Sequence, residues 1–471
     1  MCIWRKISRL GAYRMSSVTQ ALNHLQTTPL ETIEDEIRSG ILTDDLQAVY
    51  GDALAQELTQ MVRSTPGGVL STDGARVVIL PGVTGSTLLS NRGQLGLIWL
   101  DLLAIARGRL HQLRLHTDGA SDAPGVEIVA GRPLPIYLPL QWHLKYWAHC
   151  QVYAFPYDWR HTPAQLAEQL KAFLLRLCPD EDSPPVHLVG HSMGGLVARE
   201  FCYRYPDLAR VTVRQIIMLG TPNYGSCEPV RQITVGGGLP ELAQRLNQAN
   251  EPIRVARSFP SLYAMLPAPP EAYPEEAPLP YPFVTDAFDY YRESAYRLDA
   301  QQGFNPQLLA SAKQRYLERP RSALSVPVRI IAGYGLPTCT GVVPQESPDQ
   351  PILDFATHTN ELGDGTVPLA AVTALPGAEC YYLRGGGHGA LPYLSAVRDA
   401  VQSLIGGQRP SLPTTFLESG VLSSQPTTQP DPGPKPPLPG ELSDAELAAC
   451  AERLRSDTAT PEDWIALAQF L

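Results

Sequence analysis

The segment 188–195 constrains the fold more than any other part of the chain, because it joins a buried strand to a helix through a serine flanked by glycines. A short apolar run, 186–189, precedes it, and apolar residues at helical spacing follow it. A turn this tight holds Ser192 in strained backbone angles and exposes its hydroxyl at the carboxyl edge of a sheet. A glycine-rich turn whose serine only caps the helix is the alternative, but the flanking strand and helix favour a nucleophile elbow.

Strand patterns alternate with helix patterns along much of the chain. The runs with the composition of buried strands are 76–80, 151–155, 186–189, 214–219, 326–332 and 379–383. A βαβα order of this kind predicts an α/β fold with a mostly parallel sheet and helices on both faces. Together with the elbow, it predicts the α/β-hydrolase fold, with a large lid or cap insertion.

An acid and a histidine follow the last two predicted strands. Asp364 lies in a polar turn between glycines, and His388 lies 24 residues further on, in another glycine-rich turn. Alone, the aspartate could be a turn-former and the histidine an ordinary loop residue. The chain order Ser192, Asp364, His388 is nevertheless the order that an α/β-hydrolase requires, so we predict that these residues form a catalytic triad.

A second small-residue turn, 81–86, follows the strand 76–80. In an α/β-hydrolase, one oxyanion donor comes from such a loop, and the other is the amide of the residue after the nucleophile. The expected donors are therefore the backbone N–H groups of Thr84 and Met193. An ordinary strand-ending turn is the alternative reading of 81–86.

Changes in composition divide the chain into segments. Residues 1–75 are expected to be an N-terminal helical extension that packs on the main domain, and 76–406 the catalytic domain. Residues 407–440 are proline-rich and predict a linker, and 441–471 carry two helix-capping signals. That small helical appendage is expected either to bind a protein partner or to fold back, and linker and appendage are expected to be dispensable for turnover of a soluble ester.

Residues 223–325 lose the α/β periodicity and are rich in proline and aromatic residues. An insertion of this length beside a nucleophile indicates a cap over an apolar acyl-binding cleft, whereas irregular packing is the alternative. We expect Phe288, Tyr290 and Tyr291 to be exposed and to meet a lipid surface. Membrane contact would then be peripheral and would pass through the cap.

The net charge of −10 gives no sequence-independent attraction for nucleic acid or for anionic lipid headgroups. No apolar run reaches the roughly 18 residues of a spanning helix, and the basic N-terminal residues lack the apolar stretch of a secretory signal. The eight cysteines are scattered, without metal-ligand spacing, so we expect reduced thiols and neither a metal nor a cofactor. These features indicate a cytoplasmic protein, peripheral at most to a membrane, for which Met15 is an alternative start.

Several motifs together resemble one family, the lecithin:cholesterol acyltransferases and phospholipid:diacylglycerol acyltransferases, in its short bacterial form. The motifs are Leu80-Pro81-Gly82 with Gly85, Ile98-Trp99-Leu100-Asp101, Pro156-Tyr157-Asp158-Trp159-Arg160, the elbow, Leu219-Gly220-Thr221-Pro222 with Gly225-Ser226, Pro260-Ser261-Leu262-Tyr263, Gly363-Asp364-Gly365-Thr366-Val367, and His388. They span about residues 76–405. The resemblance implies the same triad and oxyanion amides, and a structural ion pair between Asp158 and Arg160.

The residues and the resemblance together predict a serine-dependent lipid acyl hydrolase or acyltransferase, which passes an acyl group from a phospholipid or acylglycerol to water or an alcohol. The family's plasma members have a secretory signal and its eukaryotic storage-lipid members a membrane anchor, and neither is evident here. The alternatives are a carboxylesterase for small soluble esters and a non-catalytic scaffold with a hydrolase fold. Three triad residues in the required order speak against the scaffold.

Overall fold

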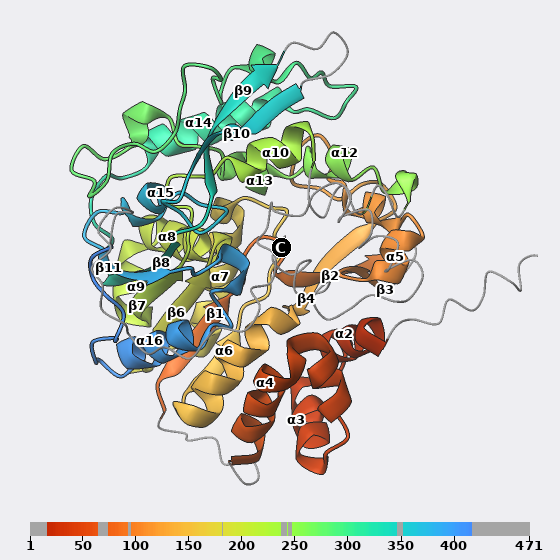
Figure 1. The fold of residues 1–471 in the computed structure, drawn as a ribbon, viewed down its shortest axis with the longest axis vertical. Coiled ribbons are helices and arrows are strands. Elements are labelled where there is room, and N and C mark those ends of the chain that lie inside the picture. The colour runs from red at the N-terminus through yellow and green to blue at the C-terminus, as the bar shows by residue number, and fades with distance from the viewer. Residues whose placement is uncertain are drawn as a thin grey trace, which may run out of the picture.

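The computed structural model describes residues 17–64, 74–92, 96–180, 182–236, 243, 247–345 and 352–416. Met15, most of the predicted linker and the whole predicted appendage at 441–471 lie outside the described residues. Figure 1 shows a central sheet with helices around it, a group of cap elements on one side and the N-terminal helices on another.

The central sheet has six strands, and every pairing in it is parallel. In spatial order the strands are β11 (Glu379–Arg384), β8 (Val328–Tyr334), β7 (Val213–Leu219), β6 (Val186–His191), β1 (Arg76–Leu80) and β5 (Gln151–Ala154). The predicted α/β-hydrolase fold with a mostly parallel sheet is confirmed, and each of the six predicted runs forms one strand.

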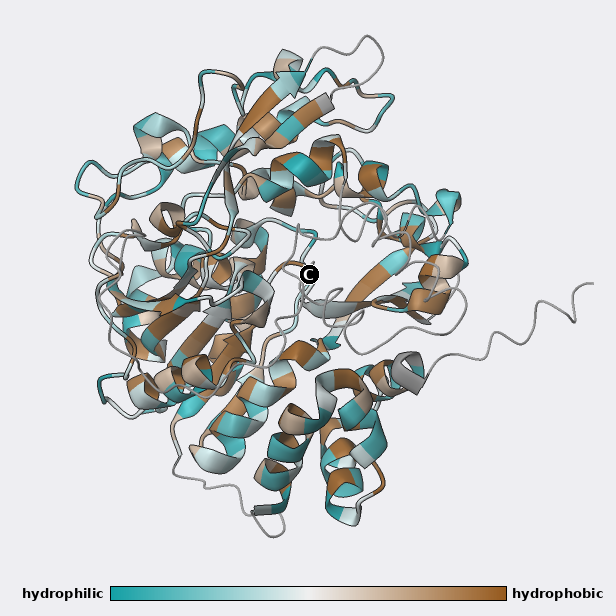
Figure 2. Ribbon diagram, viewed as in Figure 1, coloured by the Kyte–Doolittle hydropathy of each residue, from teal (hydrophilic) through white to brown (hydrophobic). Residues whose placement is uncertain are grey.

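Two apolar layers cover the sheet, one on each face. Leu188 lies in the same buried cluster as side chains of α7 (Pro163–Leu177), α8 (Met193–Arg204) and α15 (Leu369–Thr373). The next residue, Val189, lies in a second cluster, with side chains of α6 (Leu138–Trp142) and α16 (Ser395–Ile405). Because both faces are buried, the inner strands are mostly apolar, as Figure 2 shows for the centre of the sheet.

Local signals in the sequence begin and end several of these helices. The Thr162 side chain accepts a hydrogen bond from the Gln165 amide, and the Gln165 side chain bonds back to the Thr162 amide. Pro163 occupies the first turn, where its missing N–H costs no hydrogen bond. This capping box fixes the start of α7 where the sequence predicts it. A further helix, α9 (Pro206–Thr212), leads into β7.

A small antiparallel sheet, which the sequence analysis did not predict, lies between β1 and β5 in the chain. Its strands are β2 (Ser86–Arg92), β3 (Gly96–Trp99) and β4 (Glu127–Pro133), in the order β3-β2-β4, and α5 (Leu102–Ala106) and the 3-10 turn η1 (Arg109–Leu113) follow β3. Register shifts interrupt both pairings of β2, so the polar and apolar residues do not alternate regularly along these strands.

The cap consists of short helices and loops. Its helices are α10 (Glu228–Thr234), η4 (Gln248–Asn250), α12 (Pro252–Ala256), α13 (Pro260–Ala264), η5 (Pro270–Ala272), η6 (Glu293–Tyr296) and α14 (Pro306–Glu318). A second insertion joins it after β8, the antiparallel hairpin of β9 (Thr338–Gln345) and β10 (Ile352–Asn360), which bridges to the cap between Val284 and Gly341. Figure 1 shows the hairpin beside α10 and α14. The cap therefore includes a piece beyond the predicted 223–325.

Several aromatic residues of the cap are buried in the same apolar cluster that covers one face of the central sheet. Phe288 and Tyr290 are 1% and 2% exposed, and the ring of Phe288 lies 5.2 Å from that of Tyr296. Tyr291 is half-buried and packs against a further small cluster. The expectation that Phe288, Tyr290 and Tyr291 are exposed to a lipid surface is therefore wrong. The rings of Phe288 and Tyr290 instead pack in the apolar cluster that the cap shares with the main domain.

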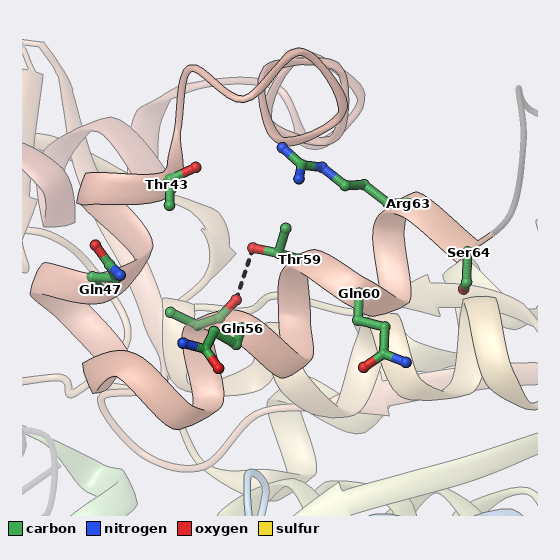
Figure 3. Close-up of a pocket in the computed structure, with 8 residues that line it drawn as sticks. Thr43, Gln47, Gln56, Thr59, Gln60, Arg63 and Ser64 are labelled. Atoms are coloured by element: carbon green, nitrogen blue, oxygen red, sulfur yellow. Dashed lines mark hydrogen bonds between the residues drawn. The ribbon is translucent and has the colours of Figure 1, made fainter.

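The N-terminal segment forms three helices, α2 (Ser17–Thr27), α3 (Leu30–Ser39) and α4 (Thr43–Ser64). Their apolar residues share a cluster with Trp142 of α6, and the Glu34 carboxylate accepts a hydrogen bond from Lys145 at 2.6 Å. A hollow lies on α4, where Figure 3 shows Arg63 pointing toward a neighbouring helix. No helix in the described part of the chain is long and apolar enough to cross a membrane.

The chain remains packed on the main domain beyond α16. The Tyr382 amide of β11 donates a hydrogen bond to the Pro413 carbonyl at 2.9 Å, and Leu412 is buried. The ring of Phe416 lies 5.5 Å from Tyr382 and 6.3 Å from Tyr334. The first residues of the predicted linker, through 416, thus belong structurally to the edge of the sheet.

Candidate active site

The elbow between β6 and α8 has the geometry that its glycines require. Ser192 has φ 50° and ψ −122°, a strained conformation for a residue with a side chain. A methyl group on Gly194 would lie 2.2 Å from the Leu80 carbonyl oxygen, and one on Gly190 would lie 2.5 Å from the Gly195 nitrogen. The strand, the turn and the helix are therefore packed too closely for any other residue at these two positions.

The structure brings Ser192, His388 and Asp364 together from three elements. His388 lies in the short turn η7 (His388–Ala390) after β11, and its Nε2 atom is 2.9 Å from the Ser192 hydroxyl oxygen. Its Nδ1 atom is 2.7 Å from Oδ2 of Asp364. Asp364 is completely buried, and the other two side chains are nearly so.

Hydrogen bonds to its other oxygen fix the Asp364 carboxylate. Oδ1 accepts the backbone N–H groups of Thr366 at 3.0 Å and Val367 at 2.7 Å. The His388 amide also donates to the Asp364 carbonyl at 2.9 Å. With Oδ2 as an acceptor only, the His388 ring carries its proton on Nδ1 and presents Nε2 as an acceptor for the serine hydroxyl.

The loop after β1 lies against Ser192, and aromatic side chains hold it in place. A methyl group on Gly82 would lie 3.1 Å from the Ser192 Cβ atom. Trp99 Nε1 donates to the Thr84 carbonyl at 2.7 Å, Trp159 Nε1 donates to the Ser86 carbonyl at 2.9 Å, and the Tyr157 hydroxyl donates to the Pro81 carbonyl. Thr84 has φ 60°, which is strained for a β-branched residue.

Of the two amides expected to be oxyanion donors, one belongs to the residue after Ser192 and the other lies in the loop after β1. Met193 is the first residue of α8, where backbone N–H groups have no acceptor within the helix and the helix dipole is positive. Thr84 lies in the loop that contacts Ser192. The N-terminal end of α8 therefore places the positive end of a helix dipole next to Ser192, which suits a developing negative charge.

Asp158 and Arg160 form the ion pair that the resemblance implies, with Arg160 Nη2 2.5 Å from Asp158 Oδ2. Burial acts to raise the pKa of Asp158, but the hydrogen bonds and charge of Arg160 outweigh it and hold this pKa well below its ordinary value. Arg160 also donates to Asp122 at 2.7 Å and to the Leu113 carbonyl at 2.9 Å. The pair thus fastens the end of β5 to the small antiparallel sheet region, and it touches no triad residue.

Sequence reasoning did not identify Tyr137 and His191, which are buried beside the candidate triad. Tyr137 bonds to both the Gly82 amide and His191, and His191 bonds to the His388 carbonyl. The position of His191 next to Ser192 was visible in the sequence, but no pattern distinguished Tyr137, which ends the 3-10 turn η2 (Pro135–Tyr137).

We also considered metal-binding groups, the hollow on α4 and the cysteines as candidate sites. In the described ranges, no group of three or more His, Cys, Asp or Glu side chains is arranged to hold a metal ion. The hollow of Figure 3 is lined by neutral polar side chains and Arg63, and none of its lining residues belongs to the elements that carry Ser192, Asp364 or His388. The described cysteines of the catalytic domain are unpaired, and four of them are buried.

A parallel sheet with a nucleophile elbow after one strand, and an acid and a histidine after the last two, defines the chain as an α/β-hydrolase. A model of the lecithin:cholesterol acyltransferase family matches residues 143–282. The resemblance that the motifs predict is therefore shown for this stretch of the chain. It contains Ser192 and the first part of the cap, and it ends before Asp364 and His388.

Curated relatives carry the same family name. The human phosphatidylcholine-sterol acyltransferase is 29% identical over 40% of this chain and 42% of its own length, and the mouse protein is 31% identical over the same shares. Lecithin-cholesterol acyltransferase-like 1 of Arabidopsis thaliana is 27% identical over 47% of this chain and 52% of its own length. The chain thus spans about half the length of the curated relatives it matches.

Solved structures resemble the fold at low sequence identity. A chain of the Tle4-Tli4 complex is 13% identical with a TM-score of 0.48, and the match covers 71% of this chain and 99% of that one. The mature lipase BlEst2 of Bacillus licheniformis is 12% identical with a TM-score of 0.37, and the match covers 72% of this chain and 96% of that one.

Proposed function

We propose that the protein is a serine-dependent lipid acyl hydrolase or acyltransferase, which cleaves an ester of a phospholipid or acylglycerol through an acyl-enzyme. The observation that carries the proposal is the buried chain of hydrogen bonds from Ser192 through His388 to Asp364, with distances of 2.9 and 2.7 Å. The family match around Ser192 supports an acyl ester as the substrate class.

In the first half-reaction, the Ser192 oxygen attacks the ester carbonyl while its proton passes to Nε2 of His388. The imidazolium that forms is held by Asp364, whose carboxylate is already oriented by two backbone amides. The amides of Thr84 and Met193 stabilise the tetrahedral oxyanion. His388 then protonates the leaving alcohol, and the acyl group remains on Ser192.

In the second half-reaction, water or an alcohol donates its proton to His388 and attacks the acyl-enzyme. The same oxyanion amides stabilise the second tetrahedral intermediate, and its collapse returns the proton to Ser192. The triad side chains are buried. An alcohol that keeps water out of this buried site would be favoured as the acceptor, because water competes with an alcohol for the acyl-enzyme.

The test of the reaction and its substrate is one experiment with purified protein and mixed phospholipids and acylglycerols, with and without an added alcohol. Mass spectrometry should find free fatty acid or a new acyl ester, together with a lysolipid or partial acylglycerol. The Ser192→Ala variant should give neither. Turnover of small soluble esters, with no lipid product in either reaction, would instead support the carboxylesterase and contradict the lipid substrate.

We further propose that the protein acts in the cytoplasm and meets lipid peripherally through the cap. Among the described residues of the cap, the large apolar side chains that remain exposed are Val235 and Leu317. Because contact through such side chains depends on apolar burial, vesicle binding should persist at high salt. Binding that disappears at high salt would contradict an apolar contact and indicate an electrostatic one.

A further inference from the structure

A buried chain of hydrogen bonds links the loop after β1 to the turn that carries His388. The Gly82 amide lies 2.7 Å from the Tyr137 hydroxyl oxygen, and that hydroxyl lies 2.9 Å from Nδ1 of His191. Nε2 of His191 lies 3.0 Å from the His388 backbone carbonyl oxygen. Tyr137 is 1% exposed and His191 is 3% exposed, so water does not compete for these bonds.

The chemistry of the partners fixes the direction of every proton in this chain. The His388 carbonyl can only accept, so the single proton of a neutral His191 ring lies on Nε2, and Nδ1 is an acceptor. The Tyr137 hydroxyl therefore donates to Nδ1, and its oxygen accepts the Gly82 N–H. Each donor meets one acceptor, so the chain is complete and has one arrangement.

Both side chains remain uncharged over the range in which esterases work. Burial, with the nearby His388 charge, lowers the pKa of His191 to about 3. Burial also raises the pKa of the Tyr137 hydroxyl well above its ordinary value, although the Gly82 amide opposes this. With both groups neutral, the hydrogen-bond geometry allows this proton arrangement near neutral pH.

We propose that Tyr137 and His191 are positioning residues, which set the oxyanion loop and the His388 turn at a fixed separation across Ser192. The inference rests on the proposed function of Ser192, Asp364 and His388, and goes beyond it. Ser192 lies between the two ends of this hydrogen-bond chain: a methyl group on Gly82 would lie 3.1 Å from its Cβ atom, and Nε2 of His388 lies 2.9 Å from its hydroxyl oxygen. The loop that carries Thr84 and the turn that carries His388 are therefore linked through two buried side chains.

This link would matter most in the transition state. The base must stay within hydrogen-bond reach of the serine while the loop amide meets the oxyanion, and a misplacement of about 1 Å can cost about a hundredfold in rate. Breaking these hydrogen bonds would leave the ground-state binding of substrate nearly unchanged. Loss of the chain should therefore lower kcat much more than it changes KM.

Two substitutions of His191 distinguish its two hydrogen bonds, the one to Tyr137 and the one to the His388 carbonyl. In His191→Asn, the side-chain oxygen can still accept from Tyr137, but the shorter side chain cannot reach the His388 carbonyl. In His191→Gln, the longer amide can donate to that carbonyl, as Nε2 does. We expect kcat for a soluble p-nitrophenyl ester to fall by about tenfold to a hundredfold in His191→Asn, less in His191→Gln, and KM to change by less than about threefold in both.

A matched control comes from the same strand. His187 of β6 is also buried, and burial lowers the pKa of its ring to about 4, but its partner is Gln215 at 2.7 Å. His187→Gln should leave kcat within about twofold of the wild type, because the bond it loses does not reach the site. Equal losses of kcat in the variants of His187 and His191 would mean that any buried histidine of β6 matters, and would overturn the inference.

A double-mutant cycle then tests the link itself. Tyr137→Phe removes both bonds of the hydroxyl, and it should lower kcat about as much as His191→Asn. Because both substitutions break the same hydrogen-bond chain, the fold-loss of kcat in the double variant should be much smaller than the product of the two single fold-losses. Melting temperatures and circular dichroism confirm that each variant is folded, and rates are normalised to sites titrated with a phosphonate.

The outcomes distinguish this inference from the function on which it rests. A wild-type protein that neither turns over the ester nor reacts with the phosphonate at Ser192 would contradict the proposed function. An active wild type with folded variants whose kcat values are unchanged, or whose effects multiply independently, would leave that function intact and overturn the positioning role of Tyr137 and His191.

Discussion

At the scale of single residues, the candidate site depends on one carboxylate, that of Asp364. Asp364 bonds to His388 through one oxygen and to two backbone amides through the other. Asp354, ten residues earlier in β10, bonds instead to the Ala356 amide and to Thr357, and no bond joins it to His388. Asp364 is therefore the acid that contacts the histidine of the site, whereas Asp354 makes only local hydrogen bonds within β10.

Asp364→Asn should lower kcat/KM for a soluble ester by about a thousandfold or more, because the amide favours the wrong tautomer of His388. Asp354→Asn is the matched control and should change kcat/KM by less than about threefold. Steady-state kinetics of both folded variants provide the comparison. Loss of activity in Asp354→Asn, with Asp364→Asn active, would identify the wrong acid.

Residue patterns predicted the members of the candidate triad but not the residues that support them. Ser192, Asp364 and His388 each lie in a glycine-rich turn after a strand, and a turn of that kind is visible in the sequence. Tyr137 reaches His191 across 54 positions, and Trp99 reaches Thr84 across 15. Such contacts arise from the packing of whole elements, so no local pattern marks them.

At the scale of elements, the elbow depends on the close approach of α8 to the end of β1. A methyl group on Gly194 would meet backbone oxygens of Leu80 and Pro81 at 2.2 and 2.6 Å. Backbone cannot move aside as a flexible side chain can. The helix would have to shift away from the sheet, and Ser192 would move with it.

Gly194→Ala should therefore destabilise the protein and abolish ester turnover, because α8 can no longer pack closely against the end of β1 and Ser192 is displaced. Gly387→Ala is the control: Gly387 adjoins His388, has φ −69°, and its nearest foreign atom would be a Leu336 methyl at 3.6 Å. Thermal melting and ester kinetics of the two variants should differ sharply. A stable, active Gly194→Ala protein would contradict the close packing described for the elbow.

Elements with a strong period were predictable, and irregular ones were not. The six strands of the main sheet contain mostly apolar runs, and α7 opens with a capping box, so both have a signal in the sequence. The strands β2 and β4 contain register shifts, and the hairpin β9–β10 contains a further irregularity, so their residues do not alternate cleanly. The expected N-terminal helical extension forms three helices, and Gly51 at φ 72° interrupts α4.

At the scale of the whole molecule, the catalytic unit extends beyond the boundary that composition suggests. Proline and small residues after Gly407 resemble a linker, yet Leu412 is buried and Phe416 packs on Tyr334 and Tyr382. A composition of this kind allows an extended strand-like segment that follows a sheet edge. The sequence could not distinguish this from a free linker, because the partner rings lie in β8 and β11.

A chain that ends after Phe416 should keep the melting temperature and the ester turnover of the full chain. One that ends after Gly407 should melt lower, because it exposes Tyr334 and Tyr382 and loses two ring contacts of about 0.5–1.5 kcal/mol each. Differential scanning calorimetry of the two truncated chains makes the comparison. Equal stability of both would show that residues 408–416 contribute nothing to the fold.

The cap packs on the main domain through shared apolar side chains. Its buried rings, such as those of Tyr296 and Phe304 with centroids 5.0 Å apart, lie in the same cluster as Leu188 of the central sheet. The Ser226 hydroxyl, near the start of the cap, donates to the Thr366 carbonyl at 2.6 Å, beside Asp364. The cap is therefore joined by a hydrogen bond to the loop that carries Asp364.

The central claim is that Ser192 is an activated nucleophile, and covalent labelling with a fluorophosphonate tests it most directly. Peptide mass spectrometry should locate the label on Ser192 alone in the wild-type chain, and on no residue in Ser192→Ala. The labelling rate should fall by about a thousandfold or more in folded His388→Ala, because the serine then lacks its base. Labelling of another serine, or equal rates in the wild type and His388→Ala, would contradict the account.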